Sequence, residues 1–253
     1  MAMPAWETKV RDRVRRGVRK YGKFFLDAKA QKRSEADISG LVFVMLEEVF
    51  GYDKMSEVTA EYKAKSQFAD YAIKLSGKPV ILIEMKAPSV KLTQNHLFQV
   101  SGYAMNLGLE WVVLTNGLAW QLFHISKTTP LEEDPVFACD ISEGLREETL
   151  CNLCALTREH VVRGEPRKTY ERVQAVRPQN LLRALYAEPV LREIRRNLKA
   201  NTGHRAETDE LCELIERHLL RPELVGKVKR PRKAPARAQP RKETGLAEAA
   251  TPE

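Results

Sequence analysis

The sequence predicts an α/β fold: a mixed β-sheet core flanked by helices, with a small helical C-terminal unit and a disordered basic tail. Three observations support it. Apolar residues recur at helical spacing in two N-terminal segments, alternating apolar runs separated by turn residues follow them, and only helical patterns continue after about residue 163. Helices interleaved with strands in this way are typical of a mixed sheet. We therefore place the sheet domain at residues 1–163, the helical unit at 164–222 and the tail at 223–253.

Two helices are predicted ahead of the sheet. Over residues 6–25, valines and a tyrosine recur at helical spacing between arginines, which indicates a basic amphipathic helix. The next helix begins after Ser34, because Ser34 and the acid at Asp37 form a capping-box pattern, and it ends at Gly51. This pattern places Glu35 in the first turn of a helix whose later turns are apolar.

Turn residues separate the predicted strands. Glycine and proline between two alternating runs favour one hairpin, and an Asn-Gly pair favours a second. Thr93 caps a helix between the two hairpins that reaches about Leu107. The predicted strands cover residues 58–62, 67–75, 80–86, 111–114 and 119–125, and the predicted later helices cover 145–162, 181–198 and 208–220.

The composition excludes several protein classes. Hydrophobic residues make up 43% of the 253 residues and charged residues 30%, which excludes a collagen-like, mucin-like or wholly disordered chain. The run Val80–Ile83 is far too short to span a membrane, and the first residues lack a signal-peptide pattern. The 4 cysteines do not form a secreted disulfide framework. We expect a cytoplasmic protein with no membrane partner.

The positive charge is concentrated near the two ends of the chain. The formal net charge is +8, and both 9–33 and 227–242 are strongly basic. Such patches favour a polyanion, usually nucleic acid, although a solvated helix face and a solubilising tail remain the alternative. The candidate DNA-binding residues are Lys227, Lys229, Arg230, Arg232 and Lys233.

The residues with the clearest chemical meaning lie on the first hairpin. Glu84 and Lys86 are two apart at the end of a strand, so their side chains share a face. A register that pairs Lys74 with Val80 brings Asp70 opposite Glu84, about 5 Å away. Two carboxylates and a lysine would then converge.

Such a cluster suits metal-dependent chemistry. Two nearby carboxylates repel each other, and Mg²⁺ (or Mn²⁺) with oxygen ligands offsets that repulsion. A metal and a fixed ammonium are also the apparatus for hydrolysing phosphodiesters. The alternative is an edge hairpin with a charged outer face. The apolar run 79–83 favours a central strand, whose end is typical of a site. In the next helix, His96, Gln99 and Tyr103 lie on one face. This face is either a polar stripe beside the site or simply the solvent-exposed side of the helix, and we favour the second interpretation for His96.

Several segments of the chain together match the pattern of a known family. They are Ser34-Glu35-Ala36-Asp37, Phe68-Ala69-Asp70-Tyr71, Ile83-Glu84-Met85-Lys86-Ala87-Pro88, Gln99-Val100-Ser101-Gly102-Tyr103, Glu110–Gly117 and Trp120–His124. These segments resemble the PD-(D/E)XK nuclease superfamily, and more closely the N-terminal nuclease domain of type I restriction enzyme R subunits. The resemblance covers about residues 30–130 and implies a restriction-endonuclease-like fold.

The resemblance implies a role for each matching residue. Asp70 and Glu84 would be metal ligands, with the carbonyl of Met85 a third. Lys86 would be the catalytic lysine, and Glu35 the helix acid that supports the site, with Asp37 as a competitor for that role. In the active site, Gln99 and Tyr103 would correspond to the glutamine and tyrosine of a QxxxY motif. Ala69 departs from the superfamily pattern, which has proline there.

A second departure concerns the motor that follows this domain in R subunits. The 253 residues contain no Gly-x-x-x-x-Gly-Lys-Ser/Thr phosphate loop, so we expect a stand-alone relative without ATP-driven translocation. The sequence thus predicts an Mg²⁺-dependent DNA endonuclease in restriction or defence. The alternatives are a nuclease-fold DNA-binding module that does not cut and a plain interaction protein. The sequence carries no signal for oligomeric state.

Overall fold

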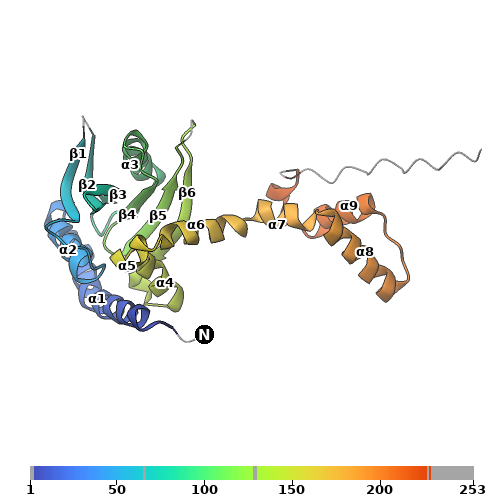
Figure 1. Cartoon of the computed structure of the whole chain (residues 1–253), viewed down its shortest axis with the longest axis horizontal. Helices are drawn as coiled ribbons and strands as arrows, with labels where there is room; N and C mark the ends of the chain where they lie inside the picture. The colour runs from blue at the N-terminus through green and yellow to red at the C-terminus, as the bar shows by residue number, and fades with distance from the viewer. Residues whose placement is uncertain (1–2, 65–66, 128–129, 227, 229–253) are drawn as a thin grey trace, which may run out of the picture. The chain divides into compact units, whose positions relative to one another are not determined.

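The computed structural model describes residues 3–64, 67–127, 130–226 and 228 (Figure 1). The chain divides into two compact units between Gln174 and Ala175. The first unit contains a mixed sheet with helices on both faces, which confirms the predicted α/β class. Among the described residues, no helix combines the length and apolar character needed to cross a membrane.

Within the described residues, six strands form one sheet in chain order. Neighbouring strands are antiparallel except for β3 and β4, which are parallel because the helix α3 (Gln94–Asn106) crosses over between them. The strands are β1 (Val58–Ala64), β2 (Gln67–Leu75), β3 (Lys78–Met85), β4 (Trp111–Thr115), β5 (Ala119–Ile125) and β6 (Glu133–Asp140). The sequence did not predict β6. Pro135 interrupts its pattern, and proline is tolerated there because β6 is an edge strand.

Helices cover the two faces of the sheet unequally (Figure 1). One face packs on α1 (Ala5–Ala30), α2 (Glu35–Glu48) and α4 (Glu147–Ala155), which share a large buried cluster with the strands. The other face packs on α3 through a smaller cluster. Both helices predicted at the N-terminus are present. The predicted capping box is also present, since the Asp37 N–H donates to Ser34 Oγ and the Ser34 N–H donates to Asp37 Oδ2.

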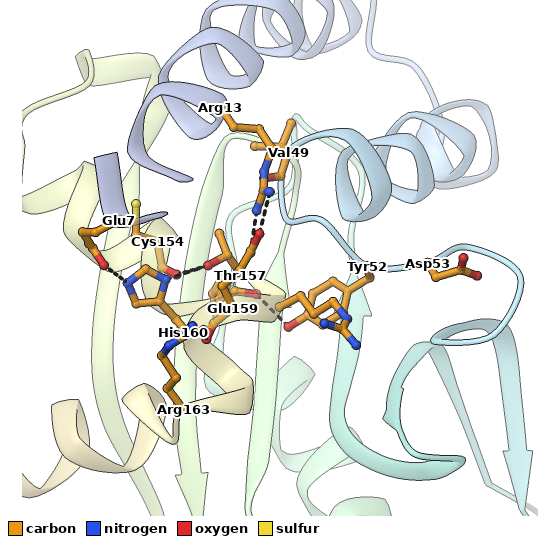
Figure 2. A network of polar contacts seen from close by, with 12 residues as sticks. Glu7, Arg13, Val49, Tyr52, Asp53, Cys154, Thr157, Glu159, His160 and Arg163 are labelled. Atoms are coloured by element: carbon orange, nitrogen blue, oxygen red, sulfur yellow. Dashed lines mark hydrogen bonds and ion pairs between the residues drawn. The ribbon is translucent and has the colours of Figure 1, made fainter. Parts of the chain in front are cut away.

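Polar contacts fasten α1 to the segment that follows α4 (Figure 2). The Arg13 guanidinium donates to both carboxylate oxygens of Glu159 at 2.7 Å, and its Nε donates to the Val49 carbonyl at 3.0 Å. Close to the start of α1, His160 Nε2 lies 3.0 Å from the Glu7 carboxylate. These contacts link α1 both to the end of α2 and to α5 (Arg158–Val162).

Two helices predicted as continuous are each broken in the structure. The segment 145–162 forms α4 and α5, which are separated at Thr157, where the side-chain hydroxyl donates to the Cys154 carbonyl. The segment 181–198 is divided between α7 (Pro178–Leu185) and α8 (Glu188–Thr202). Pro189 explains this second break, because proline fits the first turn of a helix but not its interior.

The second unit is helical and has a core of its own. It consists of α7, α8 and α9 (Thr208–His218), followed by a short 3-10 helix at Pro222–Leu224. The buried side chains of this core are Leu182, Tyr186, Leu191, Leu211, Cys212 and Ile215. The remaining helix, α6 (Glu165–Ala175), belongs almost wholly to the first unit, where Tyr170 donates to the Asp134 carboxylate of β6 at 2.8 Å.

Candidate active site

The candidate site lies at the end of β3, an inner strand of the sheet. Ile83 and Met85 face the large cluster under α1 and α2, whereas Leu82 faces the cluster under α3. β3 is therefore apolar on both faces until its last residues, as the sequence predicted. Glu84 and Lys86 break this pattern in a largely buried setting, with 13% and 18% of their side chains exposed.

The neighbouring strand brings Asp70 to the same place. Tyr71 pairs with Ile83, so Asp70 and Glu84 are the next residues along the two strands. Asp70 Oδ2 accepts a hydrogen bond from the Met85 N–H at 2.6 Å. The predicted pairing of Lys74 with Val80 is wrong, because the register shifts after Ile73 and Lys74 pairs with Pro79. Beyond this shift, the strands follow the register that the prediction required.

Lys86 is held between acidic groups. Its ammonium lies 2.6 Å from Glu84 Oε1 and 3.6 Å from Glu35 Oε2. The same nitrogen donates to the Met85 carbonyl at 2.9 Å. The Lys86 side chain therefore points to the carboxylates of β3 and of the first turn of α2 rather than to open solvent.

Burial has the largest effect on the pKa values of the Asp70 and Glu84 carboxyls. It raises the pKa of Asp70, against the opposing effects of the Met85 hydrogen bond and the Lys86 charge. It also raises the pKa of Glu84, where the nearby charges of Asp70 and Glu35 act in the same direction. For Lys86, burial lowers the pKa, but the hydrogen bond to Glu84 and the surrounding acids outweigh it, so the pKa is raised overall. When both carboxyls are ionised, Asp70, Glu84 and Lys86 together therefore carry a net negative charge.

The two acids at the start of α2 have different positions. Glu35 approaches Lys86, whereas Asp37 is engaged in capping the helix, with its Oδ2 accepting from both the Ser34 N–H and the Ser34 hydroxyl. These hydrogen bonds lower the pKa of Asp37. Of the two candidates for a supporting acid, Glu35 is the one that contacts the cluster.

Comparison with known families agrees with this geometry. Residues 42–134 match the type I restriction enzyme R protein N terminus. The matched segment contains Asp70, Glu84 and Lys86, whereas Glu35 lies before it. No curated protein and no solved structure matches the chain. The resemblance to the R-protein N terminus is therefore confirmed for this segment of the chain.

The two residues of the QxxxY motif, Gln99 and Tyr103, have different surroundings on α3. Gln99 is exposed on α3, whereas Tyr103 is 1% exposed and its hydroxyl donates to the Tyr62 carbonyl at 3.3 Å. Tyr103 therefore packs on β1, and the roles that the resemblance implies for Gln99 and Tyr103 stay predictions. His96 accepts from the Thr93 N–H through Nδ1, a capping contact that gives it a structural role.

Sequence reasoning missed Glu61, an exposed residue of β1. Ala60 pairs with Tyr71 and Tyr62 pairs with Ala69, so Glu61 lies beside Asp70 in the ladder. Its charge contributes to the raised pKa of Asp70. Glu61 also has a φ of 48°, a left-handed conformation that is costly for a residue with a Cβ. A sequence-based search for acids opposite Asp70 in both neighbouring strands would have found it.

The strained residue coincides with a change of face in β1 and β2. Ala69 and Ala72 both pack under α3, although residues three apart in a regular strand face opposite sides. The alternation is therefore interrupted between them, where Asp70 lies. Such irregularities often mark the places where a sheet re-aims a side chain toward a site.

Two clefts meet at this irregularity. One has a volume of about 260 Å³ and extends from Glu35 to Asp70. The other has a volume of about 330 Å³ and is lined by Glu61, Phe68, Ala69, Asp70 and Glu84. Asp70 lines both, so this partly buried residue is reachable from solvent.

The donors at this point suit a hard cation. The described residues contain no group of three His, Cys, Asp or Glu side chains arranged for a metal. What they offer is two carboxylates whose pKa burial raises, with the Met85 carbonyl directly after Glu84 in the chain. Oxygen donors of this kind, completed by waters, fit Mg²⁺ or Mn²⁺. The candidate DNA-binding residues Lys227, Lys229, Arg230, Arg232 and Lys233 lie outside the described residues.

Proposed function

We propose that the chain is an endonuclease that hydrolyses DNA phosphodiester bonds with Mg²⁺ or Mn²⁺. The observation that supports this most strongly is the convergence of Asp70, Glu84 and Lys86 at the end of an inner strand, inside the segment that matches the R-protein N terminus. Partly buried charges at that position destabilise the folded protein. Their presence is explained if they bind a cation and a phosphate for catalysis.

The proposed roles follow from the contacts. Asp70 and Glu84 would hold the cation with the Met85 carbonyl, and the Met85 N–H would orient Asp70. Lys86 would place its ammonium against the scissile phosphate once the cation takes over the Glu84 oxygens. Glu35 would position Lys86 from the opposite side. A cation bound there would acidify water and offset the charge that develops on the phosphate.

The biological role proposed is restriction or a related defence against DNA in the cytoplasm. The family match points to a restriction-type nuclease. The 253 residues lack a phosphate loop, so we propose cutting without an ATP-driven motor in this polypeptide. The basic residues at 227–242 would add phosphate contacts without reading the base sequence.

A plasmid assay tests this proposal. The wild-type chain should nick or cut supercoiled DNA with Mg²⁺ or Mn²⁺, and EDTA should abolish the activity. Lys86→Ala should be inactive while its circular dichroism spectrum stays unchanged. Lys91→Ala is the matched control, since Lys91 is an exposed lysine in the loop after β3. Activity retained in Lys86→Ala would refute the site.

One observation favours a second candidate, a DNA-binding module that does not cut. The Lys86 ammonium bonds to Glu84 and to the Met85 carbonyl, two of the groups that a cation would need. If the lysine serves permanently as the counter-charge, the chain would bind DNA in a salt-sensitive way without turnover. Binding without cutting across Mg²⁺, Mn²⁺, Co²⁺ and Ca²⁺ would favour this candidate over the endonuclease.

A further inference from the structure

An exposed aromatic ring forms part of the cleft that contains the two strand carboxyls. Phe68 is 58% exposed, and it lines the 330 Å³ cleft together with Asp70 and Glu84. A cleft of this volume falls in the range of small-ligand pockets. Single exposed apolar residues need no explanation elsewhere on a surface. Here, however, the ring is the large apolar part of a wall that is otherwise made of acids and a small alanine.

A lysine accompanies the ring. Lys63 of β1 pairs with Phe68 of β2 across the hairpin, and the Lys63 ammonium lies 4.8 Å from the centroid of the Phe68 ring. This distance is within the range of a cation–π interaction. The strand pairing and the lysine hold the ring beside Asp70, two residues away in the same strand. A positive charge and an aromatic face thus lie together next to the proposed cutting site.

Aromatic faces beside cations are the arrangement with which proteins hold unpaired nucleotides. The ring stacks on a base, and the lysine contacts the backbone phosphate next to it. A base within a duplex has both faces covered by its neighbours and cannot take this position. A phosphate bound near Asp70 and Lys86 would have its own nucleotide, or the next one, within reach of the Phe68 ring.

We propose that Phe68 and Lys63 form a nucleobase-stacking site that selects DNA with an unpaired nucleotide beside the scissile phosphate. This inference rests on the proposed function, because it takes DNA as the ligand. It adds a substrate class, namely single-stranded or locally opened DNA, to a site whose acids and lysine alone recognise any phosphodiester.

Binding in EDTA tests the proposal without depending on cleavage. The probes are a 12-nucleotide single strand carrying one 2-aminopurine and a blunt duplex of the same length, measured with the full chain by anisotropy and by 2-aminopurine fluorescence. Phe68→Ala should weaken single-strand binding about tenfold and remove the fluorescence change, while duplex binding stays the same. Phe68→Trp should retain both signals.

Phe98→Ala provides the matched control, because Phe98 is 67% exposed on α3 and does not line the cleft. The inference is overturned if Phe68→Ala binds the single strand as wild type does, if it weakens duplex binding equally, or if Phe98→Ala has the same effect. A Phe68-dependent single-strand preference in a chain that never cuts would refute the endonuclease while keeping this inference. If Phe68→Ala cuts DNA as wild type does and the single strand gives no stacking signal, the inference is refuted and the endonuclease is kept.

Discussion

The main-chain N–H of Met85 donates to Asp70 Oδ2 at 2.6 Å, and this bond ties the carboxyl of one strand to the end of the next. It fixes the carboxyl where burial raises its pKa, so the metal-free protein bears a cost for keeping Asp70 ionised. A bound cation would remove that cost. The site is therefore expected to be less stable without metal than a neutral version of itself.

Asp70→Asn should separate these two effects. Asparagine keeps an oxygen that can accept from the Met85 N–H but removes the buried charge, so the metal-free variant should melt at a higher temperature than wild type. Calorimetric titration with Mn²⁺ should show lost or strongly weakened binding. Asp53→Asn is the control, since Asp53 is an exposed aspartate that caps a turn away from the cleft. Unchanged Mn²⁺ affinity in Asp70→Asn would remove Asp70 from the proposed ligand set.

The raised pKa values of Asp70 and Glu84 predict a pH dependence of stability. A carboxyl whose pKa is higher in the folded state binds its proton more tightly there, so its stabilising contribution is complete below the unfolded pKa and is lost as pH rises through the folded pKa. The free energy of unfolding of metal-free wild type should therefore fall, relative to Asp70→Asn/Glu84→Gln, as pH rises above about 4. Urea unfolding across pH 3 to 8, roughly the range over which carboxyls titrate, measures the difference. Saturating Mg²⁺ should flatten this pH dependence, and a wild type that gains stability relative to the double variant as pH rises would contradict the assignment.

Lys86→Met should destabilise the metal-free protein. The ammonium lies among Glu84, Glu35 and Asp70, and methionine leaves these acids without their counter-charge. We expect a loss of about 1–3 kcal/mol at neutral pH, typical of unpairing a buried charged hydrogen bond. The loss should shrink in acid, where the carboxyls are protonated. Mg²⁺ should restore stability but not activity, and thermal melts with and without Mg²⁺ would show this. A variant as stable as wild type at neutral pH would indicate that Lys86 does not balance the cluster.

Much of the fold was predictable because local signals and burial agree. Ser34 begins α2 with the capping box that its spacing indicates, and the Asn-Gly pair turns β4 into β5. The exceptions have physical causes. β6 was not predicted because it contains Pro135. Proline is excluded from central strands, but an edge strand such as β6 tolerates it. Thr157 divides α4 from α5 by donating its hydroxyl to a backbone carbonyl, an alternative that periodicity does not reveal.

The candidate site was predictable where it depends on spacing along strands and not where it depends on irregular backbone. Glu84 lies in β3 and Lys86 directly follows that strand, so the two converge because they are two apart in the chain, and Asp70 joins them by register. Glu61 could have been found from the strand register, which places it beside Asp70, whereas its left-handed backbone has no signal in the sequence. Tyr103 was assigned to a polar stripe, but its ring stacks with that of Tyr62 at a centroid distance of 6.2 Å, and tertiary packing decides such cases.

Glu61→Gly should stabilise the protein. The φ of 48° costs a residue with a Cβ roughly 1 kcal/mol, which glycine avoids. Glu61→Ala removes the same charge but retains the Cβ, so the difference between the two variants isolates the backbone effect from the repulsion with Asp70. Urea unfolding of both variants provides the measurement. If alanine and glycine give equal stability, the strain at this position is absent in solution.

Gly17→Ala and Gly22→Ala should change stability in opposite directions, although both glycines lie inside α1. Alanine normally favours a helix interior by about 1 kcal/mol over glycine. At Gly22 the added Cβ would lie 3.6 Å from Ile141, an ordinary contact, so Gly22→Ala should stabilise. At Gly17 it would lie 2.3 Å from a Val49 methyl, so α1 must move away from the end of α2, and we expect a net loss of about 1–3 kcal/mol.

The Val49→Ala background distinguishes this clash from other effects of the substitution. It removes the methyl groups that the new Cβ would meet, so Gly17→Ala should cost much less there than in wild type, whereas Gly22→Ala should have the same effect in both backgrounds. The four variants and their parents can be compared by urea unfolding. If Gly17→Ala is equally harmful with and without Val49, the close approach of α1 to α2 is not what fixes glycine at this position.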